Sequence, residues 1–558
     1  MPAPVGISGE RMMEDLGAIV RWTRLAGSAE ELEAARYVES RLRAAGAAAQ
    51  IVLHDAYISL PGPARLRVAG PEGGDIPCIT HSMGVSTPPG GVTAELVYAG
   101  AGDPAALAAA GAAGRIVLIG AGVTPERALA VTRAGAVGAI FTSGRVVQEM
   151  CCSPVWGSPG ESNRTGLPGV PLFSLARADG EALRARCEGT RLTVHGTVEV
   201  RTGWTKTPIV LGDLVPGHPA ADPSAYVLFS GHVDSWYRGA MDNGGANAVM
   251  LELTRAFAAR RADLRRGLRV AFWSGHSHGR YSGSAWYADN RWFDLEANCV
   301  MHINIDVVGA VGGDLLVTTA MREAEELARW AMLEGSGAAG PIKVDRMRRT
   351  SDESFWGIGV PSMFGEVSRQ TDGTFGWWIH TPDDTIDKLD PGRLVRDARI
   401  YYHALDRLLT DPVVPLDYTA TAADIGAALG EIAERSGGRV DLSPAQAAAA
   451  DLTALCARLN GARGAAGGAA GALNACLRDL GRILIPATYH RSGRFTQDPA
   501  LPSTFLPGLA PAAKLAAFAP DSDEARFLMT DLVRARNELV SALRRACVRV
   551  EGFLAEHQ

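Results

Sequence analysis

Three continuous apolar segments constrain this chain more than any other feature of its sequence. They are YVLFSG at 226–231, LRVAFWSG at 268–275 and VMHINI at 300–305. Helical stretches separate them, and none is long enough to cross a membrane. Continuous short apolar runs of this kind are typical of central parallel strands that are buried on both faces. The sequence therefore predicts an α/β fold with a mostly parallel mixed sheet flanked by helices.

Polar residues follow each of these segments directly. They are His232 and Asp234, the triplet 276–278 (His-Ser-His), and Asp306. Asp242 begins the helix after the first strand, and His380 begins IHTPDDTID. Each residue alone would be read as a loop or cap residue, but parallel strands end at the same edge of a sheet. Imidazole and carboxylate are ligands for Zn²⁺ and similar metals, so this recurrence predicts a metal site at that edge.

The pattern of expected strands and helices divides the chain into three parts. Residues 61–200 alternate short strands with Ala-rich helices and Gly/Pro turns, and strand signals stop after Pro415. We therefore expect one domain built from residues 1–60 and 201–415, an α/β insert at 61–200, and a helical domain at 416–558.

Composition excludes several classes of partner. The 558 residues are 47% hydrophobic and 21% charged, with a formal net charge of −6. So mild a charge gives no reason to expect nucleic acid or an anionic membrane as a partner. No signal peptide and no apolar run of roughly 20 residues is recognisable, so we expect a cytoplasmic protein that is not membrane-bound.

The order of the motifs resembles the co-catalytic zinc peptidases. The motifs are SGHVDS, GAMDNGGANAVMLELTRAF, VAFWSGHSHGRYSGSAWYA, INIDVVG, TSDESFWGIGVPSMFGE and IHTPDDTIDKLD. This group includes bacterial leucyl aminopeptidases, glutamate carboxypeptidase II and the transferrin receptor. The resemblance implies a zinc-aminopeptidase-like fold, a protease-associated domain as the insert, and a C-terminal helical domain that forms a homodimer.

The resemblance also implies the roles of individual residues. His232 and Asp306 would hold one metal ion, His380 would hold another, and Asp242 would bridge the two. Asp234 would orient His232, and the peptide bond after Asp242 is often cis in this group. The implied cofactor is Zn²⁺, as one or two ions, or another divalent transition metal.

The segment GHSHGRYSGS departs from the family pattern, which has two consecutive glutamates here. Counting back without gaps from Gly283-Ser284 places Ser277 and His278 under that pair. His278 can replace a carboxylate ligand, whereas the Ser277 hydroxyl cannot take a proton as the first glutamate does. Since a positioned general base is worth about 100- to 10,000-fold in rate, another group must substitute if hydrolysis persists. The candidates are His276, Glu353, Glu366 and Asp372.

These observations favour a metal-dependent hydrolase of C–N bonds, an aminopeptidase or an amidase. The site would combine the metal ligands His232, Asp242, His278, Asp306 and His380 with the catalytic groups Asp234, Ser277, Glu353 and Glu366. The substrate would be a short peptide or a small amide. Two alternatives stay open: a lyase, cyclase or isomerase that uses the same Lewis acid, and a non-catalytic binding scaffold like the transferrin receptor.

Several residues near the motifs are candidates for shaping a substrate pocket. They are Trp236, Arg238, Trp377 and Trp378, with core or rim packing as the alternative. Arg348 and Arg349 could hold a substrate carboxylate, although adjacent arginines are usually solvated. Ile379 stands where the carboxypeptidase branch has a tyrosine that stabilises the oxyanion.

Overall fold

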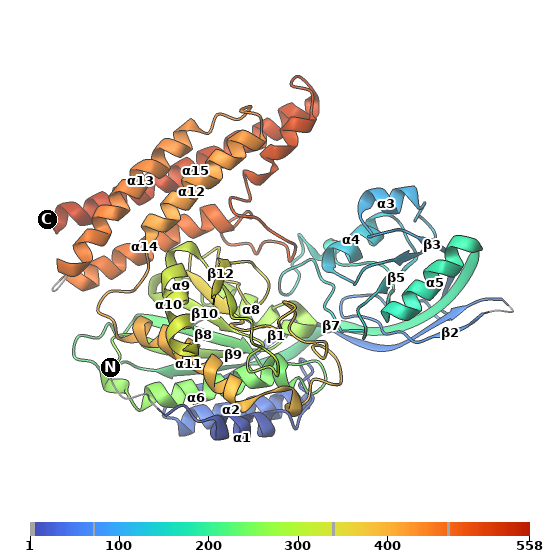
Figure 1. Cartoon of the computed structure of the whole chain (residues 1–558), viewed down its shortest axis with the longest axis horizontal. Helices are drawn as coiled ribbons and strands as arrows, with labels where there is room; N and C mark the ends of the chain where they lie inside the picture. Colours follow the sequence, from blue (N-terminus) through green and yellow to red (C-terminus); the bar gives the residue numbers. More distant parts are fainter. Residues whose placement is uncertain (1–5, 71–72, 338–340, 466–468, 558) are drawn as a thin grey trace.

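A computed structural model shows the architecture of the chain and describes residues 6–70, 73–337, 341–465 and 469–557. Its thirteen strands form one mixed sheet with the order β12-β11-β13-β10-β8-β9-β7-β3-β4-β5-β6, and β1 pairs with β7 and β2. Helices flank this sheet, and a separate group of helices ends the chain (Figure 1). The predicted mixed α/β fold with a C-terminal helical part is confirmed.

The strands fall into two groups joined by two long members. The main group is β8 (Tyr226–His232), β9 (Gly267–Trp273), β10 (Cys299–Ile305), β11 (Val317–Ala320), β12 (Lys343–Arg346) and β13 (Ser362–Gly365). The insert group is β2 (Gly74–Ile76), β3 (Val92–Tyr98), β4 (Ile116–Ile119), β5 (Gly138–Thr142) and β6 (Leu172–Leu175). The joining strands are β1 (Ala48–Val68) and β7 (Leu192–Leu214).

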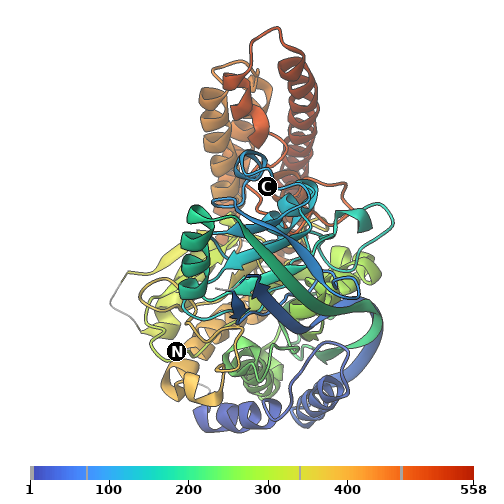
Figure 2. The ribbon, with the colours of Figure 1, turned by 90° about the vertical axis from the view of Figure 1, so that its right-hand side faces the viewer.

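The antiparallel pair of β1 and β7 carries the sheet from the main group into the insert. Proline often ends a strand, but β1 continues past Pro61 to Val68, with a shift of register between Pro61 and Ala64. A bulge of this kind accommodates a residue that has no backbone N–H to donate. The insert is therefore attached by continuous pairing of strands (Figure 2).

The strand β8 shows why the central segments are apolar throughout. Val227 and Phe229 belong to the large core cluster on one face, whereas Tyr226 and Leu228 belong to a second cluster on the other face. Successive side chains of a strand point to opposite faces, so both faces of β8 are covered. This burial fixes the register of the strand, and with it the position of His232 at its end.

Helices of the N-terminal and main parts supply these two layers. They are α1 (Gly9–Ile19), α2 (Ala29–Ala44), α6 (Ala246–Ala258), α7 (His276–Gly279), α8 (Ser282–Asn290), α9 (Trp292–Asn298), α10 (Glu325–Ser336) and α11 (Pro391–Thr410). The insert adds α3 (Pro104–Ala109), α4 (Pro125–Arg133) and α5 (Arg177–Gly189). Buried residues of α1, α2, α6 and α11 share the large cluster, and residues of α8 and α9 share the second.

The C-terminal part is helical, and it projects from one end of the molecule (Figures 1 and 2). Its helices are α12 (Tyr418–Arg435), α13 (Ser443–Gly461), α14 (Ala470–Tyr489) and α15 (Asp523–Glu556). The loop between α14 and α15 returns to the rest of the molecule, where Ala500 N donates to Pro154 O at 2.8 Å. Among the described residues, no helix is both long and apolar enough to span a bilayer.

Candidate metal centre

Two of the predicted ligands come from neighbouring strands of the main group. His232 ends β8, and Asp306 directly follows β10, which pairs with β8 in parallel. His232 Nε2 lies 3.5 Å from Asp306 Oδ1. The shared direction of the two strands brings these side chains to the same edge of the sheet.

Asp242 reaches the same place from the segment between β8 and α6. Its backbone N–H donates to Asp384 Oδ2 at 3.0 Å, and the neighbouring N–H of Met241 donates to Asp384 Oδ1 at 2.8 Å. The peptide bond between Asp242 and Asn243 is cis, as the resemblance implies. Asn243 Nδ2 donates to Ile305 O at 3.1 Å, which ties this segment to the end of β10.

His380 approaches Asp242 from the opposite side. Its Nδ1 is 2.8 Å from the main-chain oxygen of Glu149, and Glu149 N donates to His380 O at 3.0 Å. Because Glu149 belongs to the insert, the insert holds one of the predicted metal ligands in position. With Nδ1 bonded to a carbonyl, Nε2 of His380 is left without its proton and available to a metal.

The carboxylate of Asp242 has the arrangement that a bridging ligand requires. Its Oδ1 lies 3.0 Å from His232 Nε2, and its Oδ2 lies 2.9 Å from His380 Nε2. His232 Nε2 and Asp306 Oδ1 are buried, yet neither makes an aligned hydrogen bond among the described residues. Buried ligand atoms that lie close together without hydrogen bonds are suited to a bound ion. His232, Asp242, Asp306 and His380 therefore fit one or two zinc ions.

Electrostatics agree with a bound cation. Burial acts to lower the pKa of His232, but Asp306 and Asp242 hold this pKa well above its ordinary value. Burial acts to raise the pKa of Asp242, but His232 and His380 hold it well below its ordinary value. The carboxylates thus draw positive charge into the centre, either as protons on the imidazoles or as metal ions.

Asp234 acts in a different way from the one that the resemblance implies. The main-chain oxygen of Asp234 accepts from His232 Nδ1 at 2.8 Å, whereas its carboxylate Oδ1 is 3.7 Å from that nitrogen. The carboxylate instead accepts from the backbone N–H groups of His276 at 3.2 Å and Ser277 at 2.9 Å. It therefore positions the segment after β9.

The structure brings His276 into the centre, whereas His278 lies behind it. Ligand atoms of His232, His276 and Asp306 lie within 4.8 Å of one another, and the rings of His232 and His276 stack with centroids 3.8 Å apart. Asp352 Oδ2 is 2.9 Å from His276 Nδ1, which leaves Nε2 free. His278 is fully buried against Trp236, and neither of its nitrogens makes a hydrogen bond.

The backbone after α7 explains why counting residues without gaps gives a different pairing. Arg280 and Tyr281 both have positive φ, at 49° and 69°. These consecutive left-handed residues turn the chain between α7 and α8, so the positions before Gly283 do not follow one regular path. Neither the Ser277–His278 pair nor His278 as a ligand is established by this geometry, and both stay predictions.

The three other acidic candidates occupy different environments. Glu353 is buried on the wall of the central cavity, accepts from the N–H groups of Thr350 and Ser351, and has a pKa that burial raises to about 8. Glu366 also lines the cavity but is paired with Arg369, whose Nε lies 3.0 Å away. Asp372 is exposed and bonds to Thr374, away from the cavity.

A cavity of about 990 Å³ opens over this centre. The main part supplies Trp236, Ile379 and the metal-ligand candidates Asp242, His276, Asp306 and His380. The insert supplies residues 124–126, and the C-terminal loop supplies residues 500–505. The cavity wall therefore combines all three parts of the chain.

Trp377, Trp378 and Arg238 lie outside this cavity wall, whereas Arg348 and Arg349 line it. Trp378 is buried and donates to Met241 Sδ at 3.2 Å, and Trp377 is half exposed beneath Arg145. Arg238 bonds to main-chain oxygens near α1. These residues support the surrounding loops.

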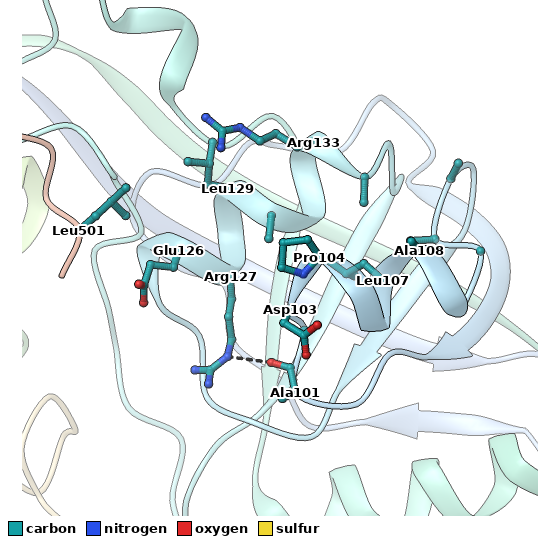
Figure 3. Close-up of a pocket in the computed structure, with 16 residues that line it drawn as sticks. Ala101, Asp103, Pro104, Leu107, Ala108, Glu126, Arg127, Leu129, Arg133 and Leu501 are labelled. Carbon is teal, nitrogen blue, oxygen red and sulfur yellow. Dashed lines mark hydrogen bonds between the residues drawn. The ribbon is translucent and has the colours of Figure 1, made fainter. Parts of the chain in front are cut away.

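A second hollow, of about 830 Å³, lies on the insert between α3 and α4 (Figure 3). Leu107, Leu129 and several alanines line it, with Leu501 at its edge. It contains none of the predicted metal ligands. The chemistry therefore belongs to the cavity over His232 and Asp242.

Several residues that position the centre had no clear signal in the sequence. Ser351 Oγ donates to Asp306 Oδ2 at 3.0 Å, and Asp352 holds His276. Both belong to the motif TSDESF, in which the sequence indicates a role for Glu353 alone. Asp384 lies in TPDDTID, and Glu149 comes from the insert, where nothing marks it.

The sheet, the shared carboxylate and the imidazoles around it together define a metallopeptidase-type hydrolase. Residues 210–405 match the profile of peptidase family M28. The match confirms the resemblance to the co-catalytic zinc peptidases and the expectation of a metallohydrolase.

Similar proteins cover more of the chain. Carboxypeptidase Q of Mus musculus is 24% identical over 338 residues, covering 57% of this chain and 67% of its own. A probable glutamate carboxypeptidase, VP8, of Zea mays is 24% identical over 495 residues, covering 74% and 68%. An aminopeptidase from Aneurinibacillus sp. strain AM-1 is 22% identical, with a TM-score of 0.57 over 72% of this chain and 94% of its own. A zinc aminopeptidase from Bacillus subtilis is 20% identical, with a TM-score of 0.57 over 74% of this chain and 98% of its own. The two structures share the fold.

Proposed function

We propose that this protein is a zinc-dependent hydrolase that cleaves an amide bond in a short peptide or a small amide. The observation that carries the proposal is the position of Asp242, with one oxygen 3.0 Å from His232 Nε2 and the other 2.9 Å from His380 Nε2. When bound, zinc supplies a Lewis acid that polarises the carbonyl and activates water.

Individual residues hold this centre in a defined way. His232, Asp306 and one oxygen of Asp242 would bind one ion, and His380 with the other oxygen would bind the second. We propose that His276 completes the first set with its free Nε2. Its bond to Asp352 is the carboxylate–histidine arrangement that orients many metal-binding imidazoles.

Glu353 is our proposal for the group that accepts the proton in place of the missing glutamate. It lines the cavity, its carboxylate forms no ion pair among the residues that the structure describes, and it has a pKa of about 8. A carboxyl whose pKa lies near neutral pH is well suited to exchange protons. Glu366 is less suited, because Arg369 neutralises its charge.

The walls of the cavity support a small substrate. A volume of about 990 Å³ is at the upper end of the range for small-molecule sites. The insert and the C-terminal loop both border the cavity. This favours a short peptide or a small amide, and the two carboxypeptidases and two aminopeptidases above are consistent with it.

Metal analysis and a substrate screen test this proposal. Purified protein should contain stoichiometric zinc and should cleave members of dipeptide, aminoacyl-anilide or acyl-amide libraries in a reaction that a chelator stops. Absence of transition metal, together with no rise in melting temperature on adding zinc, would contradict it. Metal without chelator-sensitive cleavage would instead favour a lyase, cyclase or isomerase.

We also propose a cytoplasmic homodimer with a protease-associated domain at residues 61–200. Support for the dimer comes from α15, where Phe527 is 73% exposed and Val548 is 66% exposed. Single exposed apolar side chains also occur on monomers, so substitution of Phe527 is needed to test the interface. Light scattering after chromatography should give twice the chain mass, and Phe527→Asp should lower it towards the monomer.

A further inference from the structure

Trp156 is a residue of the insert that lies against the segment carrying His276. Its neighbour Gly157 donates its backbone N–H to Arg280 O at 2.6 Å. The Trp156 ring is buried, with its centroid 4.2 Å from that of Tyr281. The rings of Tyr281 and His276 in turn meet edge-to-face, with centroids 4.8 Å apart. The insert therefore contacts both sides of the metal centre.

A chain of hydrogen bonds joins Trp156 to His276 through three buried side chains. Trp156 Nε1 donates to Ser354 Oγ at 2.8 Å, and Ser354 Oγ lies 2.8 Å from Ser284 Oγ. Ser284 Oγ donates to Asp352 Oδ1 at 2.7 Å, and Asp352 Oδ2 lies 2.9 Å from His276 Nδ1. Ser354, Ser284 and Asp352 are each at most 1% exposed, so water does not compete for these bonds.

The chemistry of its two ends gives this chain a single direction. An indole N–H can only donate, and a carboxylate can only accept. Ser354 therefore accepts from Trp156 and has its own proton available for Ser284. Ser284 Oγ is also 3.2 Å from a main-chain oxygen, but the Asp352 carboxylate is closer and charged, which makes it the stronger acceptor. With both Asp352 oxygens accepting, the proton of His276 stays on Nδ1, and Nε2 is free for a metal.

We propose that Trp156 is a positioning residue for His276 that acts through Ser354, Ser284 and Asp352. The inference rests on the proposed function, in which His276 is a metal ligand, and it gives the insert a part in holding the metal. Partners that orient a metal-binding imidazole are worth about 10- to 100-fold in metal affinity. Trp156 lies two hydroxyls further out, so its share is that of one hydrogen bond, about three- to tenfold.

The zinc affinity of the full chain, measured by competition with a chelator of known affinity, tests this without turnover. Trp156→Phe keeps an aromatic ring against Tyr281 and removes the N–H donor, so zinc should bind about three- to tenfold more weakly. Trp292→Phe makes the same change at a buried indole whose N–H has no hydrogen bond among the described residues. It should leave the affinity unchanged. Equal zinc affinities in the two variants would overturn the proposal.

A double variant separates the chain of hydrogen bonds from packing. Ser284→Ala breaks the chain next to Asp352, so Trp156→Phe should weaken zinc binding little further in that background. Fully additive losses would show that Trp156 acts through packing alone, and the proposal would be wrong.

Cobalt(II) in place of zinc adds a spectroscopic measurement, because its visible absorption depends on the ligands and their geometry. Trp156→Phe and Ser284→Ala should change this spectrum in the same way, and Trp292→Phe should not change it. A wild-type spectrum in Trp156→Phe would contradict the proposal.

His276→Ala separates failure of this proposal from failure of the proposed function. If that variant keeps the zinc affinity and the cobalt spectrum, His276 is not a ligand and the role of Trp156 is wrong. Chelator-sensitive cleavage by the wild-type protein would still support the hydrolase. Conversely, weaker zinc binding in Trp156→Phe, in a protein that cleaves none of the amides, would support Trp156 and remove the hydrolase.

Discussion

The two sides of the metal centre are held in place by different means. His232 and His380 each bind a main-chain oxygen through Nδ1, at 2.8 Å in both cases. The segment 276–281 is held by side chains: Asp234 bonds to its backbone, and Asp352 bonds to His276. The first side contains metal ligands that the resemblance implies, whereas on the second side the resemblance predicts Ser277 and His278 in place of two glutamates.

This difference indicates which part of the site can change its chemistry through substitutions. A ligand oriented by main-chain oxygens depends on the fold itself, so its neighbours can vary while its direction stays fixed. A segment oriented by side chains can acquire a new arrangement through a few substitutions. Substitutions in the cage around Asp242 and in segment 276–281 should therefore have separable effects: loss of metal from the first and a change of reaction from the second.

The largest effect should come from the cage. Asp242→Asn removes the carboxylate that faces both His232 and His380, so both ions should be lost or weakened. Because a Lewis-acid ion is worth several kcal/mol, kcat/KM should fall by about a thousandfold or more. Metal content per chain and chelator-sensitive cleavage measure this. Asp383→Asn, an exposed neighbour of Asp384, is the matched control; full metal content in Asp242→Asn would refute the bridging role.

Glu353→Gln should impair the reaction and spare the cage. If Glu353 accepts the proton, kcat should fall by about 100-fold or more while zinc content stays the same. Glu366→Gln should have a smaller effect, since Arg369 already neutralises Glu366. Single-turnover kinetics with measured metal content distinguish the two. Equal losses in both variants would mean that Glu353 acts only by holding the loop at Thr350 and Ser351.

A smaller effect, on zinc affinity, should show whether His276 or His278 is the metal ligand. His276→Ala removes the imidazole close to His232 and Asp306 and should weaken zinc binding by about 10- to 100-fold, as losses at metal sites and their supporting groups do. His278→Ala should weaken it less, because that ring packs behind the centre against Trp236. Competition with a chelator of known affinity measures both. The reverse order of effects would restore the pairing of His278 with the second glutamate.

The sequence predicted the sheet and the positions around its edge because these depend on local patterns. Continuous apolar segments predict buried strands, and the residues that follow those strands meet in space regardless of the loops between them. For this reason the structure brings His232 and Asp306 together, and Asp242 and His380 reach them from loops. The sequence predicted that these residues lie near one another, because the order of the strands determines which strand ends are adjacent.

Other features depend on contacts that no local pattern contains. The direction of the His276 side chain depends on the left-handed turn at Arg280 and Tyr281, which residue counting cannot detect. Glu149 acts through its backbone, so its side-chain type gives no signal. Pro61 suggested the end of a strand, but pairing with β7 continues across it through a shift of register.

Glu323, a buried carboxyl outside the metal centre, can be compared with Glu353. Glu323 is 2% exposed, accepts from Thr421 Oγ1 at 2.9 Å, and has a pKa that burial raises to about 7. Like Glu353 it has a raised pKa, but it does not line the cavity. A raised pKa alone is therefore not a mark of catalysis.

Glu323 should influence stability without influencing the reaction. The folded state keeps the proton of Glu323 up to about pH 7, whereas the unfolded chain releases it near 4.5. The free energy of unfolding should therefore fall as pH rises through this window, by up to about 3 kcal/mol from this group. Denaturant titrations at pH 4.5 and 7.5 should show a smaller fall for Glu323→Gln, with metal content and activity unchanged. An identical pH dependence in the variant would show that Glu323 is already ionised in the folded protein.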